Sequence, residues 1–291
     1  MTRSFQYLRP DSPHDACELK ARHGGRAVFW AGGTDLLLQW RRGAIDFEYC
    51  IDLSDLDDLR QIRNNDGVTT IGALATIVSL QTHESLGRDF PVLLDMADRF
   101  ATPQIRNIAT VGGNLCHGVP SADSAPPLIA LGAEVKLVSL ERERILPIES
   151  FFEGPKKTAL REGEMLAEIS IQRLPERSAC TFERMARSYV DIALASVACR
   201  LTVDDEDRIS QARIVLGAVA PVPLRSTGAE DLLIGIPLSD VTEELLDEVA
   251  GRAAADTRPI SDVRTSAAYR KHMSAVLAKR AVADAARRLG E

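Results

Sequence analysis

The feature that most constrains the fold is the alternation of strand-like and helical segments at the start of the chain. Three short apolar segments have the pattern of strands: Phe5–Leu8, Ala27–Ala31 and Tyr49–Leu53. Between the first two, Ser12-Pro13 provides an N-cap and a first-turn proline for a helix that Gly24-Gly25 ends. A second helix is predicted over Thr34–Arg42, where apolar residues recur at helical spacing. This order predicts a small α/β unit.

The middle of the chain changes to hairpin strands mixed with helices. The turn Asn64–Gly67 separates two strand-like runs, Leu59–Arg63 and Val68–Leu74, and its sequence is typical of a hairpin. A glycine-rich loop is predicted at the end of Gln104–Asn114. Further helices are predicted near 77–86, 91–100 and 125–131, and further strands near 135–140, 144–147 and 165–171.

A third unit is predicted from about residue 177 onwards. Alternate residues of 192–203 are apolar, which predicts a strand with one buried face. A polar turn leads from it to a second strand at Arg213–Ala220. Two amphipathic helices follow, one around Val241–Val249 and a longer one that starts near Ser261.

The composition excludes several classes of function. The 291 residues include 35 Lys and Arg against 42 Asp and Glu, so the formal charge of −7 gives no general attraction to nucleic acid. The longest apolar stretches are shorter than the roughly 18–20 residues of a membrane helix. The first residues contain no apolar signal segment. We therefore expect a cytoplasmic globular protein that binds neither nucleic acid nor a membrane.

The cysteines predict no metal centre in this chain. They are odd in number, lie far apart and never form a C-x-x-C pair: Cys17, Cys50, Cys116, Cys180 and Cys199. This pattern indicates neither a disulfide framework nor a zinc or iron–sulfur site. If the protein moves electrons, its redox centre is not built from its own sulfur atoms.

Two paired-glycine motifs are the candidate ligand-binding elements. The first, Ala31–Asp35 (AGGTD), joins a strand to a helix, and the second, Thr110–Asn114 (TVGGN), lies in the predicted loop. Because glycine has no Cβ, backbone N–H groups can converge on an anion, and a helix N-terminus favours negative charge. Two such motifs with little basic side chain nearby suit a dinucleotide pyrophosphate bound mainly by backbone amides.

Each glycine motif taken alone also has a simpler interpretation. A single Gly-Gly pair is more typical of a tight turn than of a ligand site. Thr34 and Asp35 also fit the roles of N-cap and first-turn acid. Neither motif matches G-x-G-x-x-G or G-x-x-x-x-G-K-S/T, which disfavours a Rossmann fingerprint and a Walker A loop.

Five ordered segments together resemble a known family. They are AGGTDLL (31–37), TTIGALAT (69–76), PQIRNIATVGGNL (103–115), SADSAPPLIALGAEV (121–135) and SDVRTSAAYRKHM (261–273). At these intervals they resemble the FAD-binding medium subunit of molybdenum hydroxylases. That family includes the flavin subunit of aerobic carbon monoxide dehydrogenase and the flavin domain of xanthine dehydrogenase. The resemblance covers nearly the whole chain.

The resemblance implies an α+β fold. A FAD-binding domain of the p-cresol methylhydroxylase type is expected, made of a first subdomain at 1–55 and a second at 56–176. A C-terminal domain of antiparallel sheet and helices, of the carbon monoxide dehydrogenase flavoprotein type, is expected at 177–291.

The resemblance also implies which residues contact FAD. Both glycine motifs are expected at the pyrophosphate, through Ala31, Gly32, Gly33, Thr34, Asp35, Thr110, Gly112, Gly113 and Asn114. Asp123 matches an acid that accepts hydrogen bonds from FAD hydroxyls, although a carboxylate there fits a helix cap before Pro126 equally well. Further contacts are expected from Phe100, Leu166 and Arg184, with Arg187 beside the cofactor and Tyr189 over the flavin ring.

Covalent attachment of the flavin and metal binding are both disfavoured at Cys116-His117. The family binds FAD noncovalently, and one histidine beside one cysteine provides too few ligands for a metal. We expect no metal site and no catalytic side chain in this chain, because the cofactor performs the chemistry and the protein positions it.

The implied function is that of an electron-transfer subunit. A substrate would be oxidised at a molybdenum cofactor in a large subunit, and electrons would pass through 2Fe-2S clusters in a small subunit. FAD on this chain would deliver them to NAD+, a quinone, oxygen or another acceptor. The expected assembly is a dimer of heterotrimers.

Two alternatives remain at the level of sequence. One is a self-contained FAD-dependent oxidoreductase of the same fold, but this would need an acid–base set near the flavin, and no such set is recognisable. The other is a redox-inactive nucleotide-binding module. The visible spectrum of the purified chain distinguishes the module from the two flavin-carrying functions.

Overall fold

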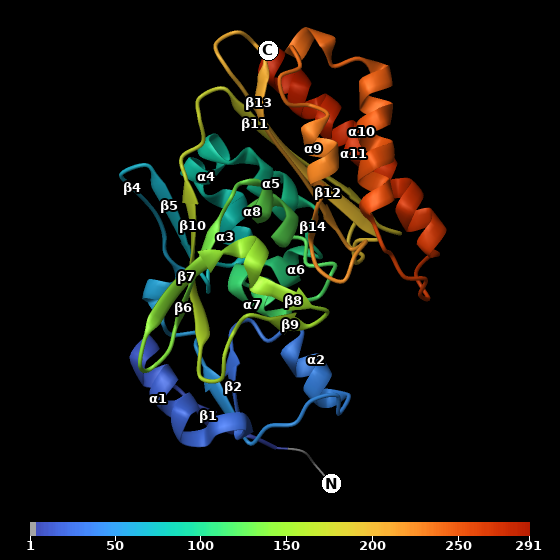
Figure 1. Cartoon of the computed structure of the whole chain (residues 1–291). Helices are drawn as coiled ribbons and strands as arrows, with labels where there is room; N and C mark the ends of the chain where they lie inside the picture. The colour runs from blue at the N-terminus through green and yellow to red at the C-terminus, as the bar shows by residue number, and fades with distance from the viewer. Residues whose placement is uncertain (1–3) are drawn as a thin grey trace.

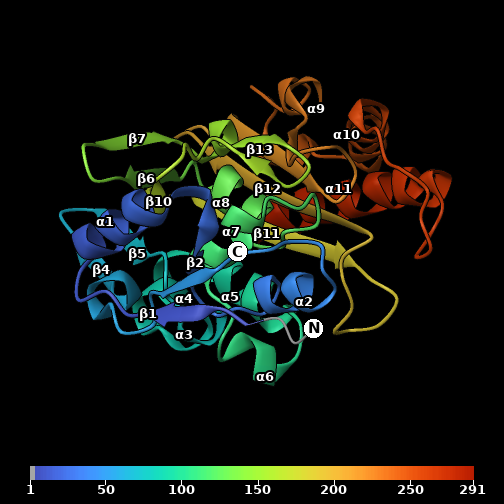
Figure 2. The ribbon, with the colours of Figure 1, turned by 90° about the horizontal axis from the view of Figure 1, so that it is seen from below.

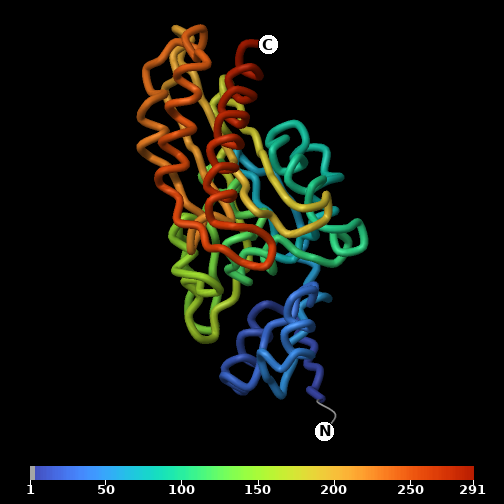
Figure 3. The backbone as a smooth tube through the Cα atoms, turned by 90° about the vertical axis from the view of Figure 1, so that its right-hand side faces the viewer, coloured from blue at the N-terminus to red at the C-terminus, as the bar shows by residue number. Residues whose placement is uncertain are grey.

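The computed structural model describes residues 4–291, so residues 1–3 of the expected first subdomain lie outside the described part. Within this range the strands form four sheets, and helices pack around three of them (Figure 1). The N-terminal unit lies at one end of the molecule and the C-terminal helices at the other (Figure 3). The mixture of helices with parallel and antiparallel sheets confirms the α+β prediction.

The N-terminal unit has the predicted order of elements. They are β1 (Gln6–Leu8), α1 (Pro13–His23), β2 (Ala27–Trp30), α2 (Leu36–Arg41) and β3 (Tyr49–Asp52). The strands are parallel, in the order β1-β3-β2. The Ser12 side chain caps α1 by accepting from the N–H of Asp15 at 3.0 Å, and Gly24 ends the helix with φ 56°. The predicted N-cap, first-turn proline and terminating glycine of α1 are therefore confirmed.

The middle unit is built on an antiparallel sheet in the order β4-β5-β10-β6-β7. Its strands are β4 (Ile62–Asn65), β5 (Val68–Gly72), β6 (Glu134–Val138), β7 (Glu143–Pro147) and β10 (Met165–Gln172), with a separate ribbon of β8 (Phe152–Gly154) and β9 (Lys157–Thr158). Its helices are α3 (Ile77–Thr82), α4 (Glu84–Asp89), α5 (Pro91–Asp98), α6 (Pro103–Arg106), α7 (Val111–His117) and α8 (Ala125–Ala130). Asp66 and Gly67 both have positive φ, as the predicted hairpin turn requires.

One helix of the middle unit differs from the prediction. The stretch 77–86 is not one helix, because His83 has an extended backbone (φ −83°, ψ 112°) that separates α3 from α4. Short 3-10 turns occur elsewhere, at Gly24–Arg26, Asp57–Arg60, Ile148–Phe151 and Leu238–Asp240.

The C-terminal unit is an antiparallel sheet in the order β11-β12-β13-β14 with helices after it. Its elements are β11 (Ser178–Met185), β12 (Ala195–Val203), β13 (Ile209–Gly217), β14 (Leu224–Arg225), α9 (Thr227–Asp231), α10 (Glu243–Asp256) and α11 (Ala267–Gly290). The last helix begins later than predicted. Asp262 accepts hydrogen bonds from the N–H groups of Arg264 and Thr265, which holds a turn there, and Ser266 is the N-cap of α11.

The central strand β12 is buried on both faces, whereas the sequence predicted one buried face. Val197, Cys199 and Leu201 pack with α10 and α11. The opposite face is covered by α8 of the middle unit (Figure 2). Ala198 on this face shares a core with Leu128 of α8. Arg200 is buried on this face and donates to Gln211 Oε1 at 3.0 Å. The polar alternation along β12 therefore marks an interface between units rather than a solvent-exposed face.

None of the helices within residues 4–291 combines the length and the apolar composition that a bilayer-spanning segment requires.

Candidate cofactor site

A cavity of about 510 Å³ lies between the end of β2 and helix α7, which is within the size range of small-molecule sites. The expected FAD contacts line it except Asp123, Arg184, Arg187 and Tyr189. The lining contacts are Ala31, Gly32, Gly33, Thr34, Asp35, Phe100, Thr110, Gly112, Gly113, Asn114 and Leu166. The fold thus brings together two glycine motifs that lie far apart in the sequence.

The glycines of the first motif are required by the local packing. A Cβ on Gly32 would lie 1.8 Å from the backbone oxygen of Ile108, so the end of β2 directly contacts the segment that precedes the second motif. Gly33 has φ +66°, and a Cβ there would lie 2.2 Å from the ring of Trp30. The N-cap of α2 is Asp35, without a side-chain capping bond, so the alternative role of Thr34 as N-cap is wrong.

The first motif also presents unused backbone donors at the cavity. Within the described residues, the N–H groups of Gly32, Gly33, Thr34 and Asp35 have no hydrogen-bond acceptor. The carbonyls of the same turn are used: Leu37 N–H donates to Gly33 O and Gln39 N–H to Asp35 O, both at 3.0 Å. Gly32, Gly33 and Thr34 are half-buried and Asp35 is exposed, so a ligand in the cavity can reach this segment. Consecutive unpaired N–H groups at a cavity wall fit an anion.

The second motif is not a loop, and this prediction is wrong. Gly112 and Gly113 lie in the first turn of α7, which Thr110 caps. The backbone donors of this turn are already used: Val111 N–H to Ala75 O (3.0 Å), Gly112 N–H to Ala73 O (2.9 Å), Gly113 N–H to Thr110 Oγ1 (3.0 Å) and Asn114 N–H to Thr110 O (3.0 Å). The second motif therefore shapes the cavity but offers no free amide in this turn.

The two glycines of α7 have different surroundings. A Cβ on Gly112 would lie 2.6 Å from both the Cβ and the backbone oxygen of Ala73, so Gly112 is needed for packing against the end of β5. Gly113 is exposed and lines the cavity. A Cβ on Gly113 would lie 2.8 Å from Oγ1 of Thr110, the N-cap of α7, so a side chain there would press on the cap as well as extend from the helix surface at the cavity.

A polar bridge crosses the cavity from α2 to the C-terminal end of α7. His117 Nδ1 lies 3.3 Å from Asp35 Oδ2, and His117 Nε2 lies 3.3 Å from Gln39 Nε2. The hydrogen bond from His117 and electrostatic attraction to His117 and Lys156 hold the pKa of Asp35 below its ordinary value, against the opposing effect of burial. The carboxylate of Asp35 is thus compensated although it lines a cavity that suits an anion.

Lys156 is a cavity residue that the sequence analysis missed. It lies in the turn between β8 and β9, with φ 60°, and its N–H donates to Gly118 O at 2.7 Å. The expectation of little basic side chain near the glycine motifs is therefore incomplete. The signal in the sequence was the Gly154–Lys157 stretch (GPKK), a turn with two consecutive lysines.

Cys116 lines the cavity beside His117, where burial disfavours its thiolate. Burial raises the pKa of Cys116 to about 12. Since the thiolate is the nucleophilic form, a thiol with this pKa is poorly suited to forming a covalent bond at neutral pH.

Asp123 and Arg184 form a buried ion pair away from the cavity lining. Arg184 Nε donates to Asp123 Oδ1 at 3.0 Å, linking the α7–α8 connection to β11. Burial raises the pKa of Asp123, and the charge of Arg184 opposes this. The alternative role of Asp123 as a helix cap is wrong, because Ser124 is the N-cap of α8. Ser124 Oγ in turn donates to Asn114 Oδ1 at 2.6 Å, which ties this connection to α7.

Tyr189 and Arg187 lie on the β11–β12 loop and do not line the cavity. Tyr189 is 63% exposed, and its hydroxyl donates to Asp98 O at 2.7 Å. Asp98 is the last residue of α5, two positions before Phe100 of the cavity wall.

The lowered pKa of Asp35 predicts a pH-dependent contribution to stability. An aspartate whose pKa is lowered in the folded state stabilises the fold at neutral pH. This contribution is lost as the pH falls from the ordinary pKa of an aspartate, about 4, through the pKa of Asp35 in the folded protein. Asp35→Asn should therefore be less stable than the parent at neutral pH, and the difference should vanish in acid. Urea unfolding across this pH range measures it, with the exposed Asp58→Asn as control. A difference that stays constant through the acid range would contradict this origin.

Removing one partner of the buried Asp123–Arg184 pair should strongly destabilise the protein. In Asp123→Ala the guanidinium of Arg184 stays buried without its carboxylate, which typically costs about 3–5 kcal/mol. Asp95→Ala opens the partly exposed pair with Arg288 and should cost less than about 1 kcal/mol. Denaturant unfolding compares the two variants. If both variants lose the same free energy of unfolding, burial does not determine how much the Asp123–Arg184 pair contributes to stability.

Comparisons with known proteins agree over the whole length of the chain. Residues 3–174 match the model of the FAD binding domain in molybdopterin dehydrogenase, and residues 180–285 match the CO dehydrogenase flavoprotein C-terminal domain. The xanthine dehydrogenase FAD-binding subunit of Escherichia coli O157:H7 is 33% identical over 284 residues, covering 96% of this chain and 95% of the relative. The carbon monoxide dehydrogenase medium chain of Afipia carboxidovorans is 34% identical over 279 residues, covering 96% of each.

A solved structure shows the same fold. The carbon monoxide dehydrogenase from Hydrogenophaga pseudoflava that lacks the Mo-pyranopterin moiety of the molybdenum cofactor contains a chain with a TM-score of 0.94 and 31% identity, and the match covers 99% of both chains. The sequence resemblance is thereby confirmed. The chain belongs to the family of FAD-binding medium subunits of molybdenum hydroxylases.

Proposed function

We propose that the cavity between the first glycine motif and α7 holds FAD, with the pyrophosphate on the N–H groups of Gly32–Asp35. The observation that carries this proposal is the run of four unpaired donors at the cavity wall. The charge of Lys156 would add to their attraction for a phosphate. When bound, FAD supplies the redox chemistry by accepting electrons and passing them on.

The other cavity residues would position FAD rather than react with it. Phe100 and Leu166 form apolar wall and exclude water, while Thr110 fixes the first turn of α7. His117 keeps the carboxylate of Asp35 compensated. For Asp123 and Arg184 we propose an indirect role, because their pair holds the connection whose Ser124 is bonded to Asn114.

We further propose that this oxidoreductase subunit works in a cytoplasmic complex with a large molybdenum-cofactor subunit and a small 2Fe-2S subunit, as a dimer of heterotrimers. The description of its relatives as medium chains supports companions of other sizes. The free cysteines of the described residues support a reducing compartment. The separate sheets support subdomain boundaries near residues 55 and 176.

Substitution at Gly113 tests the FAD site. Gly113→Val places a branched side chain at the cavity, so FAD occupancy should fall at least tenfold. Gly251→Val is the matched control, since Gly251 lies in α10 with nothing within 4 Å of an added Cβ. Gly33→Val is less informative because its Cβ would lie 2.2 Å from the Trp30 ring, whereas the Cβ at residue 113 would lie 2.8 Å from Thr110 Oγ1. The visible flavin spectrum gives the occupancy, and acid precipitation should release free FAD from the parent protein. Full occupancy in Gly113→Val, or flavin retained in the pellet, contradicts the proposal.

The charge near the pyrophosphate can be tested at the adjacent lysines. Lys156→Met removes the cavity charge and should weaken FAD binding about tenfold, the loss of one charge-assisted hydrogen bond. Lys157→Met removes a mostly exposed charge that pairs with Glu153, and it should leave the affinity unchanged. Titration of the FAD-free protein with FAD measures both. Equal affinities for the two variants would exclude Lys156 from the site.

A further inference from the structure

A second cavity, with a volume of about 260 Å³, lies beside β13 in the C-terminal sheet. Its walls come from β12, β13, β14 and the region of α9, which lie together in Figure 1. The charged residues that line it are Arg200, Arg213, Arg225, Glu230 and Asp231. We call it the arginine cavity, because three arginines meet in about half the volume of the cofactor cavity.

One of these arginines is neutralised within the protein. Arg225 Nε donates to Glu230 Oε1 at 3.0 Å, and Arg225 Nη2 donates to Glu230 Oε2 at 2.8 Å. Glu230 Oε1 also accepts from the N–H of Ile214 at 2.9 Å, and Glu230 is only 4% exposed. The other acid, Asp231, is exposed to solvent, which screens its charge. The buried carboxylate of the cavity is therefore already engaged.

The other two arginines lie opposite one another without an acid. Arg200 of β12 and Arg213 of β13 are register partners, so their side chains extend from the same face of the sheet. Arg200 donates to Leu131 O at 3.4 Å and to Gln211 Oε1 at 3.0 Å, and Arg213 donates to Ile129 O at 3.1 Å. Unlike Arg225, neither has a carboxylate oxygen within 4 Å among residues 4–291. Like charges placed directly opposite destabilise a sheet.

Burial makes this arrangement more costly at Arg200. Its residue is 7% exposed, and its Nε has no hydrogen-bond acceptor among the described residues. Burial and then the charge of Arg213 lower the pKa of Arg200, but a guanidinium remains charged at neutral pH. The carbonyls of Ile129 and Leu131 at the end of α8 provide only a partial negative charge. The pair of guanidiniums therefore lacks a full counter-charge.

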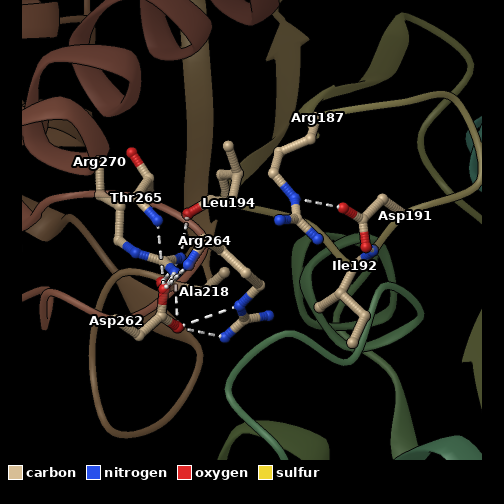
Figure 4. Close-up of polar contacts among 9 residues, drawn as sticks. All are labelled: Arg187, Asp191, Ile192, Leu194, Ala218, Asp262, Arg264, Thr265 and Arg270. Atoms are coloured by element: carbon tan, nitrogen blue, oxygen red, sulfur yellow. Dashed lines mark hydrogen bonds and ion pairs between the residues drawn. The ribbon is translucent and has the colours of Figure 1, made fainter.

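The other buried arginine of the C-terminal unit has the counter-charge that Arg200 lacks. Arg270 is 2% exposed and its Nε is also unpaired, yet its Nη2 lies 3.0 Å from both carboxylate oxygens of Asp262 (Figure 4). Asp262 accepts from Arg264 Nη2 as well, at 2.6 Å. In that cluster one carboxylate serves two guanidiniums. In the arginine cavity, no residue of the described chain plays this part for Arg200 and Arg213.

We propose that the arginine cavity binds a phosphate group between Arg200 and Arg213, either as inorganic phosphate or as the phosphate of a small metabolite. A guanidinium carries five N–H donors in a planar fork that matches a phosphate, and most of these donors are unused in both residues. The volume lies below the range of sites for larger ligands, which suits a small anion. Because both arginines also bond the end of α8, the bound group would strengthen the junction between the middle and C-terminal units.

Titration of the FAD-loaded protein with inorganic phosphate tests this site, since FAD then fills the other cavity that suits an anion. Calorimetry at constant ionic strength should show one binding event. At about five times the dissociation constant, phosphate should raise the midpoint of thermal unfolding by about 2–4 °C. Glycerol 3-phosphate is titrated in parallel, because the two sources share the same group. Binding of either compound supports the proposal, and binding of neither overturns it.

Two arginine variants locate the bound group. Arg213→Gln removes one of the two opposed charges, so the affinity for the compound that binds should fall at least tenfold. Arg208→Gln is the matched control, because Arg208 lies immediately before β13 and its side chain is about half exposed. It should keep the affinity of the parent protein. Equal affinities in the two variants overturn the proposal, since the group would then bind elsewhere.

Discussion

The cofactor site depends on two places where backbone passes so close to its neighbour that no side chain fits between. Gly32 brings the end of β2 onto the backbone of Ile108, and Gly112 brings the first turn of α7 onto Ala73 at the end of β5. These contacts fix the first glycine motif against the second, and the cavity is the space that remains between them. A methyl group at either position would separate the N-terminal sheet from α7 or α7 from the middle sheet. The glycines therefore serve the packing of the fold as much as any ligand.

Local patterns in the sequence predicted the elements whose causes are local. The cap and proline of α1, the hairpin at Asp66-Gly67 and the order of the N-terminal unit all follow from neighbouring residues. The predictions that were wrong concern features whose causes lie far away in the sequence. Gly112-Gly113 is a poor helix-forming pair, yet it lies in α7, where Ala73 O accepts from the N–H of Gly112 and Thr110 Oγ1 accepts from the N–H of Gly113. Likewise, β12 has polar residues on the face that α8 covers, and the partner of Asp123 lies 61 residues away.

The C-terminal sheet is held between the middle unit and the C-terminal helices. Its one face packs on α8 of the middle unit and its other face on α10 and α11, so it is fixed relative to the cavity. The loops at its end are held by Asp–Arg pairs and extend beyond this core. The C-terminal unit therefore shares a core with the middle unit, while its end loops lie outside that core.

Amide hydrogen exchange tests the central claim most directly, because the two glycine motifs have opposite hydrogen-bonding states. The N–H groups of Gly32–Asp35 are unpaired and should exchange rapidly in the FAD-free protein, whereas those of residues 111–114 are paired within the fold. On addition of FAD, the account predicts strong new protection at residues 32–35 and little change at 111–114. FAD binding that leaves exchange at residues 32–35 unchanged would contradict it.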